Sequence, residues 1–245
     1  MTIRNDGDSD TTPSTLIDRV GLVLDAFDGT GRLTLAQIVR RTGLPRSSTH
    51  RILEHLVRMG WLRRDERAYV LGLRLMELGT LAMHQDGLHD AARPHLHELH
   101  RATGLVVHLA VLDGTDVVYL DKLGGPLDRM VPTRVGGRRP ARDAALGRAL
   151  LAYGGADGAE FENIREVGIA YEHGRRVPGL GCIAVPIGPI GSATAAVSVC
   201  GPVQNVPFDH RLCSRVRQAA GAIRRSYDRR RFHAPVTRSP RLLTV

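Results

Sequence analysis

The sequence predicts an α+β protein made of two domains. The chain has 245 residues, a length that suits two domains of ordinary size better than one. Apolar residues recur at helical spacing in the first third of the chain, whereas the part after about residue 105 carries several short strand-like runs between helices. Strands that meet in hairpins, with helices before and after them, indicate a largely antiparallel sheet.

Two short helices open the ordered part of the chain. Apolar residues recur at helical spacing from Leu16 to Phe27 and stop before Gly29. Thr34 can cap a second helix of about two turns, because threonine accepts a hydrogen bond from the first free amides. Gly43 ends this second helix, since glycine readily adopts the left-handed conformation found after a helix.

A third helix and a β-hairpin follow a tight turn. Pro45 suits the first position of the third helix, and Gly60 ends that helix. Two short runs, 61–64 and 68–71, flank a polar turn at 65–67 and predict a hairpin. Helix, turn, helix and hairpin in this order form a winged helix-turn-helix, a unit that lays its last helix in the major groove of DNA.

Basic charge is concentrated in this first part of the chain. Ten arginines and three acids lie between Arg32 and Arg74, a local charge of +7 within a chain whose total is +9. A DNA-reading helix needs side chains that reach base edges and cationic neighbours for phosphates. The alternative interpretation is that these arginines only form a basic surface that faces solvent. The order of the helices and the hairpin instead favours binding of double-stranded DNA. The predicted DNA-binding residues are Thr34, Arg46, Ser47, Ser48, His50, Arg51, Arg63, Arg64 and Arg67.

A helix over residues 73–87 is predicted to link the two domains. Its residues Leu75, Met76, Leu78 and Leu81 lie at helical spacing and can pack against a second copy, so we expect a homodimer. We divide the chain into a disordered tail (1–14), the winged helix-turn-helix (15–72), the linker helix (73–87), the second domain (88–232) and a disordered tail (233–245).

The second domain begins with a helix at 88–102 and then takes on β character. Strands are predicted at 105–112, 116–123, 130–135, 181–187 and 193–200. Helices at 141–153 and 208–230 interrupt and close this set. The strands are expected to form the antiparallel sheet of the α+β fold.

Several stretches resemble the IclR family of bacterial transcription regulators. They are 35–38 with 42–53, 69–72, 145–152 and 182–186, and the resemblance covers about residues 15 to 230. It implies a GAF-like second domain that binds a small effector, dimers or paired dimers, and a palindromic operator. The effector-binding residues that it implies are Ala145, Leu146, Cys182, Ala184, Ser198 and Cys200. Such small residues can also simply pack a sheet against a helix.

The chain departs from the family pattern in ways that bear on the effector. Arg175 lies where the family tends to carry acids, and Arg176 is adjacent, so an organic acid is the expected effector. Arg134 and Arg142 are further candidates to hold a carboxylate. Arg148 replaces the usual family lysine.

We expect a repressor that releases its operator when effector binds, although an activator fits the sequence equally well. The segment before Gly168 is shorter than is usual in the family. This departure leaves an alternative open, in which the second domain is degenerate and serves only for oligomerisation.

No enzyme activity, cofactor or metal is expected. The run 179–184 fits a dinucleotide fingerprint, but Pro186 forbids the helix that must follow it. His97 and His100 have helical spacing without an acidic or thiol partner for a metal. An enzyme would depend on Cys182, for which no base can be placed.

The chain is expected to be cytoplasmic. Its beginning is polar and lacks the apolar stretch of a signal peptide, and no apolar run approaches the length of a membrane span. Three cysteines are an odd number, which argues against a disulfide framework and for a reducing compartment.

Overall fold

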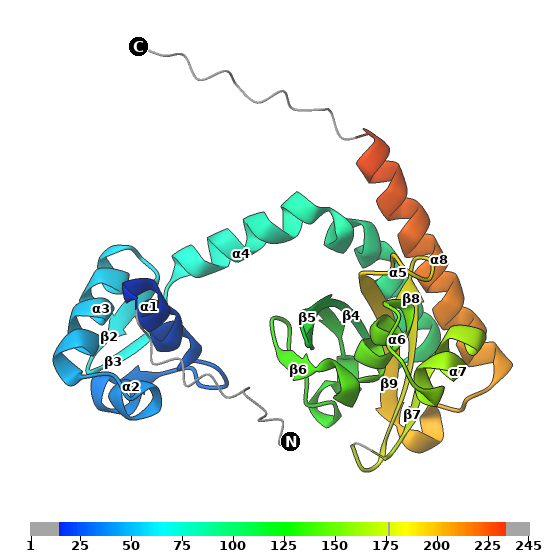
Figure 1. Cartoon of the computed structure of the whole chain (residues 1–245), viewed down its shortest axis with the longest axis horizontal. Coiled ribbons are helices and arrows are strands. Elements are labelled where there is room, and N and C mark those ends of the chain that lie inside the picture. The colour runs from blue at the N-terminus through cyan, green and yellow to red at the C-terminus, as the bar shows by residue number, and fades with distance from the viewer. Residues whose placement is uncertain (1–14, 176, 234–245) are drawn as a thin grey trace, which may run out of the picture. The chain divides into compact units, whose positions relative to one another are not determined.

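The computed structural model describes residues 15–175 and 177–233 and confirms the predicted α+β fold (Figure 1). The chain divides into two compact units, Met1–Ala82 and Met83–Val245, which are described separately. The predicted tail 1–14 lies outside the described residues. So does the predicted tail 233–245, apart from His233, which is the last residue of a helix.

The first unit is a helix-turn-helix closed by a small sheet. Its helices are α1 (Leu16–Asp25), α2 (Leu35–Thr42) and α3 (Arg46–Arg58), and its strands are β1 (Leu33–Thr34), β2 (Leu62–Asp65) and β3 (Ala68–Leu71). Strand β3 lies between β1 and β2, and both pairings are antiparallel. The predicted helices and hairpin are therefore present, together with β1, which at two residues carries no pattern that could be predicted.

Local capping explains where these helices begin and end. Gln37 N donates to Thr34 Oγ1 at 3.4 Å, and the Gln37 side chain accepts from Thr34 N at 2.8 Å, so α2 begins with a capping box. Gly43 ends α2 in the left-handed conformation, at φ 68°. Pro45, predicted as the first residue of α3, is instead its N-cap, because its ψ of 136° is extended.

The second unit is built on a six-stranded antiparallel sheet with the strand order β6-β5-β4-β9-β8-β7 (Figure 1). The strands are β4 (Val106–Asp113), β5 (Asp116–Leu123), β6 (Arg138–Pro140), β7 (Ala170–His173), β8 (Leu180–Ile187) and β9 (Ala195–Pro202). The helices are α5 (Leu88–Thr103), α6 (Ala145–Tyr153), α7 (Ala159–Val167) and α8 (His210–His233). Helix α4 (Leu73–Asp86) precedes them and contains the boundary between the two units.

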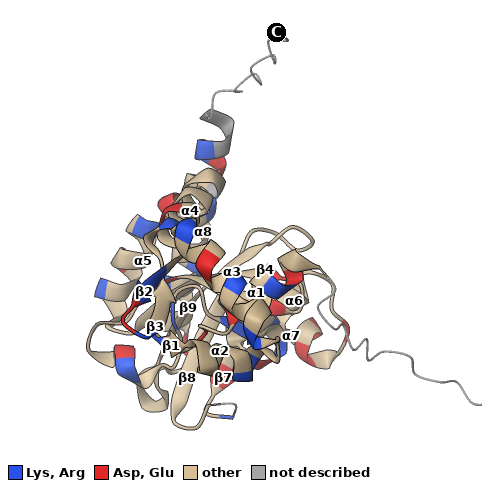
Figure 2. Ribbon diagram, turned by 90° about the vertical axis from the view of Figure 1, so that its left-hand side faces the viewer, with Lys and Arg blue, Asp and Glu red and all other residues tan. Residues whose placement is uncertain are grey.

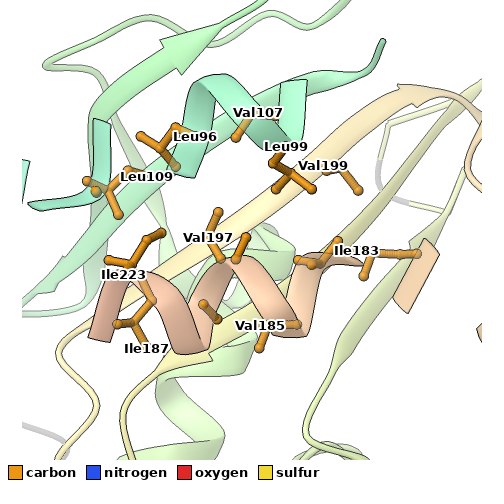
Figure 3. Close-up of a cluster of buried hydrophobic side chains, with 14 of the residues drawn as sticks. Leu96, Leu99, Val107, Leu109, Ile183, Val185, Ile187, Val197, Val199 and Ile223 are labelled. Atoms are coloured by element: carbon orange, nitrogen blue, oxygen red, sulfur yellow. The ribbon is translucent and has the colours of Figure 1, made fainter. Parts of the chain in front are cut away.

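The two faces of this sheet bury different cores, because successive side chains of a strand point to opposite faces. One core joins α5 and α8 to the sheet, and Figure 3 shows Leu96, Leu99 and Ile223 directed toward Val107 and Val197. The other core packs α6 and α7 against the opposite face through a different set of strand residues. The candidate effector site lies on this second face.

The predicted strand at 130–135 is wrong. After a 3-10 helix (Gly125–Met130), this segment is held away from regular pairing by Lys122. The Lys122 Nζ donates at 3.1, 2.9 and 2.8 Å to the carbonyl oxygens of Asp128, Val131 and Thr133. Backbone carbonyls that already have a partner do not need a neighbouring strand. The edge of the sheet is formed instead by β6.

Helix α7 and strand β7 were not predicted, and the predicted helix at 141–153 is interrupted. It consists of a single 3-10 turn (Ala141–Asp143) followed by α6. Ala144 separates them because its backbone is extended, with ψ at 140°. Strand β7 has only four residues, too few to show alternation clearly.

Candidate DNA-binding surface and effector cavity

Helix α3 has one buried face and one free face. Four residues face the core of the first unit: Thr49, Ile52, Leu53 and Leu56. On this helix, four of the predicted DNA-binding residues are exposed: Arg46, Ser47, His50 and Arg51. Ser48 is half-buried at the edge of the free face. The helix is therefore anchored by apolar packing while its polar side chains remain available to a groove.

The hairpin places a second group of arginines beside this helix. Arg63, Arg64 and Arg67 are exposed on and between β2 and β3, and basic residues are drawn blue in Figure 2. The Arg64 guanidinium lies 3.7 Å from Glu54 Oε1 of α3 and 6.0 Å from the centre of the Tyr69 ring. These contacts orient Arg64 toward α3, so the helix and the hairpin present one basic surface.

Thr34 is held by its capping role. Its hydroxyl donates to Gln37 Oε1 at 3.0 Å and its side chain is half-buried. A direct contact of Thr34 with DNA therefore stays a prediction. Its clear effect is to fix the start of α2, the helix that precedes the turn.

An apolar groove between α1 and α3 was not anticipated from the sequence. Its wall includes Leu16, Ile17, Met59 and Trp61, and Arg51 lies in its lining. Leu16 and Ile17 are 69% and 81% exposed, which is unusual for large apolar side chains in a folded unit. The spacing of Leu16 and Ile17 predicted the helix but could not show which of its faces stays uncovered.

A small cavity in the second unit brings together five of the six predicted effector-binding residues. Ala145 and Leu146 of α6 meet Cys182 of β8 and Ser198 and Cys200 of β9. Ala184 is fully buried in the core beneath α6 and does not line the cavity. The cavity volume is about 60 Å³, enough for about four water molecules.

A chain of polar groups runs along the cavity wall. His108 is 1% exposed, and its Nε2 lies 2.7 Å from Thr133 Oγ1. Its Nδ1 is 3.5 Å from Ser198 Oγ, which in turn lies 3.9 Å from Cys200 Sγ. Burial, assisted by the nearby Lys122 ammonium, lowers the pKa of His108 to about 3. The imidazole is therefore neutral, with one nitrogen that donates and one that accepts.

The arginine that lines the cavity is Arg139, which sequence reasoning did not select. Arg142 lies over the Phe161 ring at 5.2 Å, and Arg134 and Arg175 are exposed outside the cavity lining. Arg176 lies outside the described residues. The chain carries many arginines, and only the pairing of β6 with β5 places this one at the cavity.

Arg148 is a buried arginine that contacts two acidic side chains. It is 1% exposed, and its guanidinium lies 3.0 Å from Glu160 and 3.1 Å from Glu172. It also donates to the Tyr171 carbonyl at 3.1 Å. These contacts connect α6 to α7 and to β7, and Glu172 reaches the cavity lining.

The cysteines correct an expectation. An odd number argued against a disulfide framework, yet the structure joins Cys182 to Cys200 and leaves Cys213 free and buried. Cys182 and Cys200 are direct partners in the register of β8 and β9, with Cα atoms 4.3 Å apart. Counting cysteines could not show this juxtaposition, because it depends on strand register.

The described residues form neither a metal site nor a membrane-spanning helix. Among the described residues, no group of three or more His, Cys, Asp or Glu side chains could hold a metal ion. The Nδ1 of His100 lies 2.7 Å from the Leu105 carbonyl oxygen. Within the same described part of the chain, no helix is both long enough and apolar enough to cross a bilayer.

Both units are similar to known protein domains. Residues 16–66 match the IclR helix-turn-helix domain, and residues 80–160 match the C-terminal domain of the bacterial transcriptional regulator IclR. The regulator KipR of Bacillus subtilis is 34% identical over 132 residues, which are 54% of this chain and 53% of KipR. The regulator XynR of Escherichia coli is 28% identical over 199 residues, which are 70% of this chain and 79% of XynR.

Solved structures extend the similarity beyond residue 160. An IclR homologue from Microbacterium hydrocarbonoxydans, complexed with 4-hydroxybenzoate, is 27% identical and matches with a TM-score of 0.79. The match covers 88% of this chain and 100% of that chain. A transcriptional regulator from Rhodococcus matches with a TM-score of 0.73 at 26% identity, over 87% of this chain and 98% of its own.

Proposed function

The chain belongs to the IclR family, whose members are DNA-binding transcription regulators and not enzymes, and from this premise we propose that it is a repressor controlled by a small organic acid. Its effector-binding domain is the second unit. Binding of the acid there releases a palindromic operator from the first unit. The exposed basic surface formed by α3 and the hairpin is the observation that carries the DNA-binding half of this proposal.

Within the DNA-binding surface we assign different roles to different arginines. Arg46 lies in the first turn of α3, where a side chain of a groove-bound helix reaches base edges, and it can hold a guanine with two hydrogen bonds. To the exposed Arg63, Arg64 and Arg67 of the hairpin, and to Arg51, we assign contacts with phosphates. Ser47, Ser48 and His50 supply further hydrogen bonds.

Selection of bound duplexes from a random DNA library tests this half. We expect the full chain to enrich a palindromic sequence at low ionic strength, with affinity falling steeply as salt is raised. A protein that enriches no sequence under these conditions would overturn the proposal. Band shifts with the enriched duplex then provide the assay for effector.

The cavity chemistry supports an organic acid as effector. Arg139 and the first amides of α6, at Ala145 and Leu146, are suited to a carboxylate. The neutral His108, with Ser198, is suited to a hydroxyl or to another uncharged polar group. The complex of the Microbacterium homologue with 4-hydroxybenzoate makes a hydroxylated aromatic acid the first compound to test.

The cavity must enlarge to hold such a compound. Its volume of about 60 Å³ takes only about four waters, less than an aromatic acid needs. The segment around Thr133 forms part of its wall and is attached by the Lys122 hydrogen bonds and by the contact of Thr133 with His108. We propose that the effector displaces this segment, and that the movement is what the DNA-binding unit detects.

Calorimetry with 4-hydroxybenzoate, its neutral amide and the corresponding cationic benzylamine tests the effector class. We expect the acid to bind and to release the enriched duplex. Binding of the neutral or cationic compounds, with no organic acid bound, would show that the class is wrong. A chain that binds its duplex but none of a broad set of acids would instead favour a second domain used only for oligomerisation.

We further propose that the chain acts as a homodimer, or as a pair of dimers. The α4 residues Leu73, Met76 and Leu81 are 65%, 65% and 53% exposed, and Leu16 and Ile17 of α1 are exposed as well. Burying these side chains against a second copy would pair two recognition helices, as a palindrome requires. Light scattering on the purified chain measures the state directly, and a monomer that binds the palindrome would contradict the pairing.

A further inference from the structure

Two cysteines face each other in the wall of the effector cavity. Cys182 and Cys200 are partners in the register of β8 and β9, with Cα atoms 4.3 Å apart. This distance is typical of a non-hydrogen-bonded antiparallel pair, in which opposite side chains lie closest. The two sulfur atoms therefore remain within reach of each other whether or not they are bonded. The disulfide can open and close without any change in the pairing of the strands.

We propose that Cys182 and Cys200 form a redox site, at which a hydroperoxide converts a dithiol into the disulfide and thereby changes effector binding. The inference deepens the proposed function, because it adds a second input to the same cavity. A regulator built in this way would respond to an organic acid and to peroxide together.

The dimensions of the cavity select the oxidant. Without effector, the cavity has space for about four water molecules, which admits hydrogen peroxide but is too small for a bulky disulfide such as oxidised glutathione. Cys182 is half-buried at the cavity, whereas Cys200 is 8% exposed. We therefore assign the first attack to Cys182 and the resolving step to Cys200.

One molecule of hydrogen peroxide is the only oxidant that the reaction needs. The Cys182 thiolate attacks one peroxide oxygen, the O–O bond breaks, and the products are a sulfenic acid and water once the leaving hydroxide takes up the thiol proton. Cys200 sulfur then attacks the sulfenic sulfur, an S–S bond forms, and the hydroxyl leaves as a second water with the Cys200 proton. Two thiols are oxidised by two electrons and one peroxide is reduced. An added small dithiol reduces the disulfide back to two thiols by exchange and is itself oxidised to a disulfide.

The hydrogen-bond chain gives oxidation a physical consequence. In the reduced form, the Cys200 thiol can donate to Ser198 Oγ, which leaves the serine hydroxyl free to donate to His108 Nδ1. A disulfide sulfur has no hydrogen and can only accept, so the Ser198 oxygen loses that donor. The serine oxygen then becomes available to a donor on the ligand. Oxidation should therefore change the affinity for a hydroxylated acid by about fivefold, the worth of one neutral hydrogen bond.

Cys213 provides an internal control. It lies on α8, where it is buried in the core on the other face of the sheet from the cavity core. Burial raises the pKa of the Cys213 thiol, which keeps it protonated and slow to react. Peroxide should therefore spare Cys213 while it oxidises the other two cysteines.

Thiol titration of the full chain tests the chemistry. After reduction and removal of reductant, the denatured chain should titrate three thiols, and after one equivalent of hydrogen peroxide only Cys213 should remain. The Cys213→Ser variant should lose both of its thiols to peroxide, with a disulfide between Cys182 and Cys200 in the peptide map. The Cys200→Ser variant should form no internal disulfide. Retention of all three thiols in excess peroxide would overturn the proposal.

Calorimetry with 4-hydroxybenzoate and band shifts with the enriched duplex test the coupling. We expect the reduced and oxidised chains to differ about fivefold in affinity for the acid. The Cys182→Ser chain, which lacks the thiol that attacks peroxide, should bind the acid equally well before and after peroxide treatment. Equal affinities for the acid and equal release of the duplex in both redox states would refute the coupling. If neither form binds any duplex, the proposed function fails, while the thiol counts still decide whether the redox site exists.

Discussion

Replacing Lys122 by methionine should release the segment around Thr133, which forms part of the wall of the candidate effector cavity. The Lys122 side chain is only 8% exposed, and its ammonium donates to three backbone carbonyls and lies 3.0 Å from Asp128. Methionine keeps most of the apolar stem but removes every one of these donors. The carbonyls of Asp128, Val131 and Thr133 then need water, which they can reach only if the segment moves away from the sheet.

The size of the effect follows from the three hydrogen bonds. Each hydrogen bond with a charged partner is worth about 1.5 to 3 kcal/mol, and part of this is recovered when the released carbonyls meet water. We therefore expect the Lys122→Met variant to lose about 3 kcal/mol of the free energy of unfolding of the second unit. The ion pair with Asp128 contributes little, because the Asp128 side chain is 55% exposed.

Urea unfolding can separate the two units, because Trp61 is the only tryptophan and lies in the first unit. Its fluorescence should report the same transition in the wild-type and variant chains. Far-ultraviolet circular dichroism, which follows both units, should show the second transition at a lower urea concentration in the variant. Limited proteolysis should then cut between residues 125 and 135.

The control is Asp128→Asn, which removes the exposed carboxylate and keeps the backbone carbonyl. It should cost less than about 1 kcal/mol. Two results would refute the reasoning: a Lys122→Met chain within 1 kcal/mol of wild type, or an Asp128→Asn chain as unstable as the lysine variant. Either would mean that the segment is held by packing rather than by the ammonium.

Four further substitutions test the DNA-binding surface and the cavity. Arg46→Ala should relax the protein's preference for the bases of the enriched duplex and lower its binding free energy by about 1 to 3 kcal/mol. Arg64→Ala should weaken binding to all duplexes alike. Equal losses of affinity for specific and random DNA in Arg46→Ala would contradict the role assigned to Arg46. Glu54→Gln removes the acid that contacts Arg64, so anisotropy titrations should show severalfold tighter binding to every duplex at low salt. The pKa of His108 is lowered from 6.5 to about 3 in the folded chain. Between these two pH values the unfolded chain binds one more proton than the folded chain. The free energy of unfolding should therefore fall by about 1.4 kcal/mol for each pH unit from pH 6.5 down to pH 3. His108→Gln should remove this slope from urea midpoints measured across that range, and an unchanged slope would show that His108 is not the group responsible.

The helices of the first unit could be predicted almost to the residue because their boundaries are set locally. Thr34 and Gly43 act through hydrogen bonds and backbone conformation within a few residues, and both signals are visible in the sequence. Pro45 differed by one position, since a proline suits both the N-cap and the first turn in this backbone. The exposed apolar face of α1 could not be foreseen, because exposure depends on which elements surround it.

The second unit was less predictable because its decisive contacts are distant in sequence. Lys122 donates hydrogen bonds to the backbone carbonyls of a segment whose sequence otherwise resembles a strand. No local sequence pattern predicts these hydrogen bonds. Arg139 and His108 reach the cavity from strands that only the sheet brings together. One signal was available: His108 interrupts the apolar run of its strand, and a polar residue in such a run is often kept for a function. The small cavity residues were found by resemblance rather than by spacing.

Lys122 is the sole lysine in the chain, and it is nearly hidden from solvent. Among side chains, reagents that acylate primary amines therefore have this one target, and release of the segment around Thr133 from the Lys122 ammonium should make it more accessible. A protease that cuts after lysine has likewise one place to cut. The rate at which this amine is acylated should therefore report how often the cavity opens. Any compound that holds the cavity open or closed should change this rate.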